Sequence, residues 1–378
     1  MNKNIKVLSL TFICCLSSCS PSLSNLKISR EGGRFTDVQM AYLTREDVSE
    51  TTPYNGDLSV SAPNPIKLTW SGKNTVFNIN VYKNPDCELG SFVTTYRTDA
   101  NSFDFYNDEL NQPYYFFISS FTDLSLKTEV VKYEPEALTV PSPRNLYVEG
   151  VENIRDLGGW GKIVDGVYTP YMKQGMIYRS GRFNEDKANP VKVTVTSDGL
   201  YELKHHLRIK TEIDLRRSST NEIGSLTSSP LGEDVNYYNL PMYYGGNNIL
   251  TFKGTASKDD YQYNNPAKIK EFFDILAVRD NYPIDFHCSI GKDRTGCMAY
   301  LIEGLLGFDQ EIMYRDYMFT NYSQAGMCKL KDDIKDRYGK TLDSYEGETL
   351  QEKVYNYLNN VIGVSKENLD TIIDILKA

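Results

Sequence analysis

Ten consecutive residues, 287–296, restrict this chain more than any other part of its sequence. The run reads His-Cys-Ser-Ile-Gly-Lys-Asp-Arg-Thr-Gly, so that five residues separate Cys288 from Arg294. A short β-prone stretch, residues 282–287, precedes the cysteine, and an apolar stretch that ends at Gly307 follows. This order predicts a strand, a tight loop and a helix. A loop that closes onto a helix N-terminus directs several backbone N–H groups at one point, which is an arrangement that binds phosphate.

The side chains of this run fit a loop that binds phosphate and also carries a nucleophile. Cys288 is expected at the floor of the loop, where backbone N–H groups, the helix dipole and a neighbouring cation would stabilise its thiolate. Arg294 would close the ring with a planar fork that matches two phosphate oxygens better than a lysine can. Gly291 and Gly296 allow the tight backbone path that such a loop needs. The residues expected around the phosphate are Ser289, Ile290, Gly291, Lys292, Asp293 and Arg294.

These residues resemble the active-site signature of the cysteine-dependent protein tyrosine phosphatase superfamily. The version Gly-Lys-Asp-Arg-Thr-Gly is similar to a bacterial atypical branch that acts on phosphotyrosine, sometimes phosphoserine or phosphothreonine, and on phosphoinositides. Four other stretches resemble that branch and follow its order: 153–159 (Asn-Ile-Arg-Asp-Leu-Gly-Gly), 177–181 (Ile-Tyr-Arg-Ser-Gly), 213–216 (Ile-Asp-Leu-Arg) and 315–321 (Arg-Asp-Tyr-Met-Phe-Thr-Asn). The resemblance covers about residues 145–378.

One departure from the family pattern lies directly after residue 216. The family usually has a serine at the next position and a glutamate soon after it, whereas this chain has Arg217 and then Glu222. We therefore expect a remodelled loop after that strand.

The expected chemistry is a two-step displacement. Cys288 would attack phosphorus to form a phosphocysteine, which water would then hydrolyse, so that one difficult step becomes two easier ones. Arg294 and the loop amides would stabilise the equatorial oxygens as charge develops on them. The hydroxyl of Thr295 can donate to the sulfur and make it a better leaving group. His287 is expected to position the cysteine loop rather than to transfer protons.

The proton donor for the leaving oxygen is open between two aspartates, because either carboxylic acid could supply the proton. Asp214 stands at the end of a strand expected beside the loop strand, and the resemblance points to it. Asp293 lies inside the loop itself. Each also has a structural alternative, in which Asp214 holds the loop through Arg216 and Asp293 pairs with Lys292 or Arg179.

Lys292 bears on the substrate class. It would either contact a second phosphate of the substrate or be an ordinary solvated or Asp293-paired lysine. The leading hypothesis is a phosphatase of the tyrosine or dual-specificity type, and a phosphoinositide or inositol-polyphosphate phosphatase is the alternative. A third hypothesis is a surface binding protein with a silent catalytic domain.

Three residues are expected to support the loop from beneath: Asn153, Arg155 and Asp156.

Charge and composition exclude other classes of protein. The chain has 378 residues and a net charge of −9, which argues against a nucleic-acid partner because such a partner requires a basic face. It has three histidines, and no cysteine or histidine cluster has the spacing of metal ligands. We therefore expect neither a metal nor a cofactor.

The N-terminus predicts export and a lipid anchor. Two lysines precede a short apolar stretch within residues 1–19, as in a secretion signal. Residues 16–19 (Leu-Ser-Ser-Cys) resemble a bacterial lipoprotein box, in which Cys19 would be lipidated and hold the protein at a bacterial membrane outside the cytoplasm. An ordinary cleaved signal is the alternative. The polar residues 20–60 are expected to form a flexible tether.

Residues 61–134 carry a different pattern from the rest of the chain. Strand-like runs at 66–70, 76–82, 102–106 and 114–119 are separated by turns rich in Gly, Asn and Pro. They predict a small antiparallel sandwich that resembles a fibronectin type III module and could bind a protein or a glycan. A proline-containing linker is expected at 135–144.

From residue 145 to 378 strand-like and helical segments alternate. Strands are expected at 209–215, 235–240 and 282–287, a helix at 266–279, and mostly helix from 310 onward. Alternation of this kind predicts an α/β domain whose central, mostly parallel sheet is flanked by helices. The cysteine loop would then lie at the carboxyl end of a strand, where open α/β sheets bind their ligands.

Overall fold

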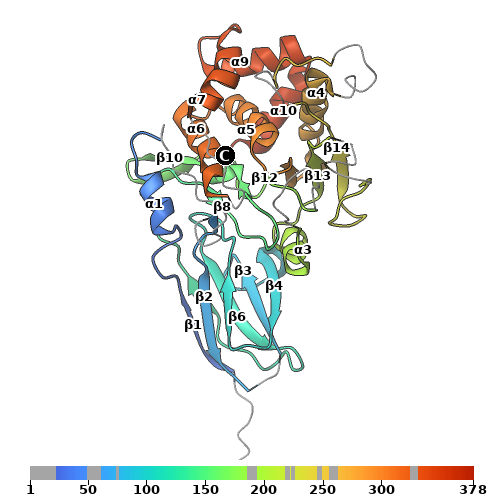
Figure 1. Cartoon of the computed structure of the whole chain (residues 1–378). Helices are drawn as coiled ribbons and strands as arrows, with labels where there is room; N and C mark the ends of the chain where they lie inside the picture. The colour runs from blue at the N-terminus through green and yellow to red at the C-terminus, as the bar shows by residue number, and fades with distance from the viewer. Residues whose placement is uncertain are drawn as a thin grey trace, which may run out of the picture.

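The computed structural model has an all-β N-terminal unit and an α/β C-terminal unit that lie end to end (Figure 1). It describes residues 23–48, 61–73, 76–184, 194–217, 222, 226–244, 249–254, 263–323 and 331–378. The predicted signal and lipidation residue, 1–19, lie outside these ranges. Within them no helix has the length and apolar character needed to cross a membrane.

Two antiparallel sheets form the N-terminal unit. The first has the order β1 (Ser24–Ser29), β2 (Ile66–Ser71), β5 (Ser102–Phe105), and the second β4 (Phe92–Thr98), β3 (Phe77–Tyr82), β6 (Tyr114–Ser120), β7 (Val131–Tyr133). In β2 the apolar side chains are buried and the alternate ones exposed, as the period of a strand requires. The buried faces share one apolar cluster, in which Trp70 meets Phe77 edge-on at 5.4 Å.

A flexible tether was expected over residues 20–60. Residues 23–48, which the structure describes, are instead folded. β1 pairs with the edge of β2, and only every second residue of β1 faces inward, so its composition looks polar. Helix α1 (Asp37–Leu43) follows and begins with a capping box between Thr36 and Gln39. α1 lies against the C-terminal unit (blue in Figure 1), where the Tyr42 hydroxyl donates to the Arg315 carbonyl at 2.8 Å.

A six-stranded sheet forms the centre of the C-terminal unit. Its order is β14 (Asn236–Asn239), β13 (Thr211–Asp214), β15 (Ile284–His287), β12 (Ile177–Ser180), β9 (Arg155–Asp156), β8 (Arg144–Asn145). The first four strands are parallel and the last two antiparallel, so the expected mostly parallel sheet is present. Every residue of β12, β13 and β15 is buried, as is usual where helices cover both faces of a sheet.

Helices surround this sheet. They are α3 (Ser197–Tyr201), α4 (Asn265–Leu276), α5 (Asp293–Leu305), α6 (Gln310–Phe319), α7 (Lys331–Ile334), α8 (Lys340–Asp343), α9 (Leu350–Asn356) and α10 (Lys366–Leu376), and a hairpin of β10 (Gly161–Val164) and β11 (Val167–Pro170) is added at one side. α5 is buried from Arg294 to Leu305, so the helix that begins at the cysteine loop is also the central helix of the unit.

Hydrogen bonds from a buried, ion-paired arginine join the two units. Arg144, at the end of the expected linker, donates Nη1 to Asp156 at 2.7 Å, Nη2 to the Asn107 carbonyl at 2.6 Å and Nε to the Asp108 carbonyl at 3.1 Å. The Asp108 carboxylate in turn pairs with Arg34. Because these charges are taken out of water, removal of one partner would leave the other uncompensated. The junction is therefore an ordered contact rather than a loose hinge.

Candidate active site

The residues around Cys288 form the predicted strand, loop and helix. β15 ends at His287, Cys288 follows, and α5 begins at Asp293. Gly291 has φ +68°, and a Cβ there would lie 2.4 Å from the carbonyl oxygen of Ser180, so no other residue fits without displacing the backbone. The backbone of the loop is therefore fixed by its glycine and by the strand behind it.

Cys288 sits in surroundings that favour its thiolate. The residue is 3% exposed. Burial raises the pKa of the thiol, but the charge of Arg294 and the nearby hydroxyl and N–H of Thr295 outweigh it, and the net pKa lies below the ordinary value. Cys288 therefore has the character of an activated nucleophile.

The lowered pKa of Cys288 predicts its rate of alkylation. We expect iodoacetamide to modify Cys288 with a pH midpoint below that of a free thiol, about 8.5, because the reagent attacks only the thiolate. Thr295→Val removes the hydroxyl donor and should raise this midpoint. The rate at each pH can be followed by mass spectrometry.

Cys87 is the internal control for this measurement. Burial, followed by the charge of Asp86, raises the pKa of the Cys87 thiol, so its midpoint should lie above that of Cys288 in the same sample. Equal midpoints for the two cysteines would contradict the assignment of Cys288 as the activated thiol.

Arg294 is held in place by a glutamate from the loop after β13. Its Nη1 and Nη2 donate to the two carboxylate oxygens of Glu222 at 3.0 and 3.2 Å, and Nη1 also donates to the Leu215 carbonyl. The guanidinium lies 4.6 Å from the ring centre of Tyr244. The late position of Glu222 led us to expect a remodelled loop, and its role as the partner of Arg294 was missed. The family pattern of a glutamate soon after the Asp-Leu-Arg strand could have indicated this role of Glu222.

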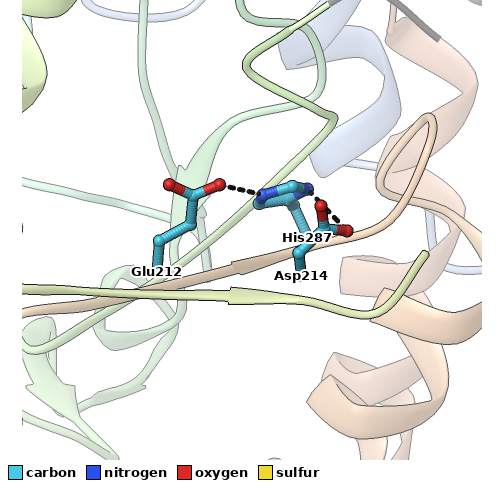
Figure 2. Close-up of side chains that lie close together, drawn as sticks. All are labelled: Glu212, Asp214 and His287. Atoms are coloured by element: carbon cyan, nitrogen blue, oxygen red, sulfur yellow. Dashed lines mark hydrogen bonds and ion pairs between the residues drawn. The ribbon is translucent and has the colours of Figure 1, made fainter. Parts of the chain in front are cut away.

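His287 lies between two carboxylates beneath the loop (Figure 2). Its Nε2 donates to Glu212 Oε1 at 2.9 Å, and its Nδ1 is 3.8 Å from Asp214 Oδ1. Burial lowers the pKa of His287, but Asp214 and Glu212 raise it more, to about 9, so the imidazole is charged at neutral pH. A charged histidine fixed on both sides is suited to orienting the strand that ends at Cys288. Sequence reasoning did not select Glu212.

The same cluster argues against Asp214 as the proton donor. Burial raises the pKa of Asp214, but His287 and Arg216 lower it to about 2, so the carboxyl has no proton to give at neutral pH. Its oxygens accept from the N–H and Nε of Arg216, each at 2.9 Å, and from Tyr237. The candidate ligand atoms of Glu212, Asp214 and His287 lie within 4.8 Å of one another, but a metal ion here would have to displace the imidazole proton that joins His287 Nε2 to Glu212.

Asp293 is the remaining candidate for the proton donor. It is the first residue of α5, its side chain is 20% exposed, and its Oδ1 lies 3.8 Å from Arg337 Nη1. The expected alternative of a pair with Arg179 is wrong, because Arg179 Nη1 binds Asp316 at 2.5 Å instead. Lys292 is 4% exposed, which excludes the alternative of a solvated surface lysine.

Asn153 and Arg155 support the loop, as expected. Asn153 Nδ2 donates to the carbonyls of Ile290 and Gly291 at 3.1 and 2.9 Å. Arg155 Nη1 donates to Asn153 Oδ1 at 2.7 Å, and its Nε binds Asp316 at 2.7 Å. These bonds engage loop carbonyls and so fix the backbone of the loop from behind.

Asp156 does not contact the loop, contrary to one of the expected placements. It binds Arg144 and accepts from the N–H groups of Gly158 and Gly175 at 2.8 and 2.6 Å, so it stabilises the junction between the units. A supporting residue that was missed is Arg182, whose Nη1 donates to the Ser289 carbonyl at 2.7 Å.

Comparison with known proteins identifies the family. A sequence model described as the tyrosine phosphatase family matches residues 146–378. The chain belongs to the tyrosine phosphatase family. A protein of Cupriavidus necator that carries the name of a tyrosine-protein phosphatase is 26% identical over 208 residues, which cover 52% of this chain and 70% of that protein.

Two solved phosphatases were also found, each 16% identical to this tyrosine phosphatase. TpbA of P. aeruginosa is matched over 49% of this chain and 91% of its own, with a TM-score of 0.28. The core catalytic domain of the PP-IP phosphatase SIW14 of S. cerevisiae is matched over 44% and 85%, also with a TM-score of 0.28.

The site of this tyrosine phosphatase has the parts of a cysteine-dependent enzyme. A thiol of lowered pKa stands at the base of a glycine-containing loop, and a fixed guanidinium stands opposite it at the start of a buried helix. These parts supply a nucleophile and a positive charge for an anionic group between them. The chain is therefore an enzyme of the protein-tyrosine-phosphatase type.

Proposed function

We propose that this phosphatase removes phosphate from phosphotyrosine through a phosphocysteine at Cys288. The observation that carries the proposal is the pairing of an activated thiol with Arg294, whose fork is fixed by Glu222. A bidentate guanidinium fits two phosphate oxygens while the thiolate meets the phosphorus from below.

The proposed reaction has two displacements. In the first, the Cys288 thiolate attacks phosphorus, the phosphorus–oxygen ester bond breaks, and the leaving phenolate takes a proton from Asp293. In the second, the Asp293 carboxylate takes a proton from water as the water oxygen attacks phosphorus, the phosphorus–sulfur bond breaks, and the thiolate is restored beside Arg294 and Thr295. Inorganic phosphate and the tyrosine hydroxyl are the products.

The leaving group tests the role of Asp293. Asp293→Asn is expected to slow hydrolysis of a phosphotyrosine peptide by about 100-fold or more, because the phenolate then leaves without a proton. Hydrolysis of dinitrophenyl phosphate, whose leaving group needs no proton, should fall by less than about tenfold. Initial rates on both substrates at one pH give this ratio.

Asp214→Asn is the matched comparison. Since Asp214 holds Arg216 rather than a proton, its replacement should change both rates by a similar factor. A loss confined to the phosphotyrosine peptide in Asp214→Asn, with none in Asp293→Asn, would return the proton donor to Asp214.

Substrate choice tests the proposal as a whole. The full chain, without added metal, would be offered a phosphotyrosine peptide, a phosphoserine peptide and a phosphoinositide, and released phosphate would be measured. We expect the phosphotyrosine peptide to have the highest kcat/KM. Preference for the phosphoinositide would favour the second candidate function, which Lys292 supports as a further cation within the loop. No release from any substrate by folded, reduced protein would favour a silent binding protein.

We also propose that the protein is anchored outside the cytoplasm of a bacterium through Cys19. The support is the sequence pattern of residues 1–19. Incorporation of a labelled fatty acid that is lost in Cys19→Ala would test the anchor. We further propose that the two-sheet N-terminal unit is a fibronectin III-like module. Its strand pattern and its single apolar core support this assignment.

A further inference from the structure

A pocket of about 760 Å³ lies where the two units meet, and none of its lining residues belongs to the cysteine loop. It is lined by β4 and β5 from the N-terminal unit and by α3 and the segment after β8 from the C-terminal unit. Figure 1 shows α3 beside β4 at this junction. Both its volume and its place between two units are typical of sites that bind small ligands or side chains.

Tyrosine rings from both units line this junction pocket. Tyr106 follows β5 and Tyr147 follows β8, and their ring centres lie 4.6 Å apart. Tyr201, at the end of α3, is 37% exposed and packs against Tyr96 at 5.7 Å. The face of an aromatic ring is electrically negative, so several half-exposed rings around one cavity favour a cation.

Carboxylates stand beside these rings without basic partners. Asp104, Glu149 and Asp198 line the pocket and are exposed, and in the part of the chain that the structure describes no lysine or arginine forms an ion pair with them. Glu149 accepts a hydrogen bond only from the hydroxyl of Thr196 and the other two accept none from a described side chain. The pocket therefore concentrates negative charge in a chain that is already acidic.

The carboxylates also shift the pKa of two of these tyrosines upward. Burial, then the charge of Asp104, raises the pKa of Tyr106. Burial, then the charges of Glu149 and Asp198, raises the pKa of Tyr147.

One basic side chain lies among the lining residues. Among the described lining residues Arg97 is the cationic one, and its guanidinium lies over the ring of Phe121 at 4.4 Å. Arg97 is thus engaged with an aromatic partner of its own.

We propose that the junction pocket binds an organic cation, either a free polyamine or the ammonium or guanidinium group of a basic peptide. The rings would meet the cation with their faces while Asp104, Glu149 and Asp198 offset its charge. A neutral sugar could stack on the tyrosines but would leave three negative charges unmatched. The proposal does not depend on the phosphatase activity, because none of these residues lies in the cysteine loop.

Binding to the full chain tests the proposal. Two probes are needed: spermidine, measured by calorimetry, and a fluorescein-labelled peptide of alternating lysine and glycine, measured by anisotropy. The double variant Asp104→Asn, Asp198→Asn should weaken the binding of the cation by about tenfold or more, because it removes two carboxylates. Binding should also weaken as salt is raised. Tyr147→Leu should weaken binding without altering the charge of the pocket.

A matched control separates the pocket from general attraction to an acidic protein. Asp165→Asn with Asp280→Asn changes the net charge equally, and both of these exposed residues lie outside the pocket. Unchanged binding of the probes in this control, together with weaker binding in the pocket variants, supports the proposal. The probe that binds with the lower Kd then shows whether the cation comes from a polyamine or from a basic peptide. The proposal is overturned if neither probe binds, if both double variants weaken binding equally, or if a neutral oligosaccharide binds in their place. Equal thermal unfolding of all variants shows that each is folded.

Discussion

Replacement of Cys288 by serine is expected to abolish phosphate release, with a loss of at least about 10⁴-fold in kcat/KM on a phosphotyrosine peptide. The surroundings of residue 288 lower the pKa of a thiol and so favour the thiolate, but a serine hydroxyl keeps its proton far above neutral pH. Since Arg294 and the loop are retained, the variant should still bind the peptide. Released phosphate and the Kd for the peptide, measured on the same preparation, separate the two effects.

Cys87→Ser is the control for the Cys288 substitution. Cys87 lies in the N-terminal unit after β3, and its replacement should leave kcat/KM unchanged. Activity of Cys288→Ser within about 100-fold of the native protein would mean that the phosphoryl group is not transferred to this sulfur.

Arg294→Lys is expected to reduce kcat by about 10³-fold although the positive charge is kept. Arg294 donates from both Nη atoms to Glu222, and this contact aims its plane across the loop. A lysine has one point of charge, so it cannot hold Glu222 and also bridge two phosphate oxygens. The kcat and KM for the phosphotyrosine peptide should be measured separately, because the loss is expected in the transition state.

Arg208→Lys provides the comparison for Arg294→Lys. The Arg208 guanidinium binds the carbonyls of Phe92 and Val93 at the junction, so the same exchange there should leave kcat unaltered. A loss of less than about tenfold in Arg294→Lys would show that charge alone is enough, and that the fixed fork is not required.

The parts of the site that follow one another in the chain could be predicted from the sequence. Cys288, Gly291 and Arg294 lie within one strand–loop–helix segment, and the spacing of such a segment is determined by local backbone geometry. The parallel sheet was also predictable, because alternating strands and helices leave few other arrangements. Asn153 was selected through the resemblance to the family, and its contact with the loop has the expected supporting character.

The contacts made between distant segments could not be predicted. Glu222 reaches Arg294 across 72 positions of the chain, and Glu212 reaches His287 across 75. The second contact exists because β13 and β15 pair in one particular register, and a shift by one residue would turn Glu212 to the opposite face. The role of Asp214 stayed open for the same reason, since its low pKa depends on His287 from the neighbouring strand.

The path of the N-terminal segment has a consequence for how this protein folds. The chain passes from β1 in one unit to α1 against the other and then back to β2, so it crosses the junction twice before the β unit is complete. Phe35, Tyr42, Leu43 and Val48 complete the apolar core of a unit whose family match begins only at residue 146. Loss of structure in either half would therefore remove packing from the other. Two regions that read as separate modules in the sequence are coupled into one cooperative body.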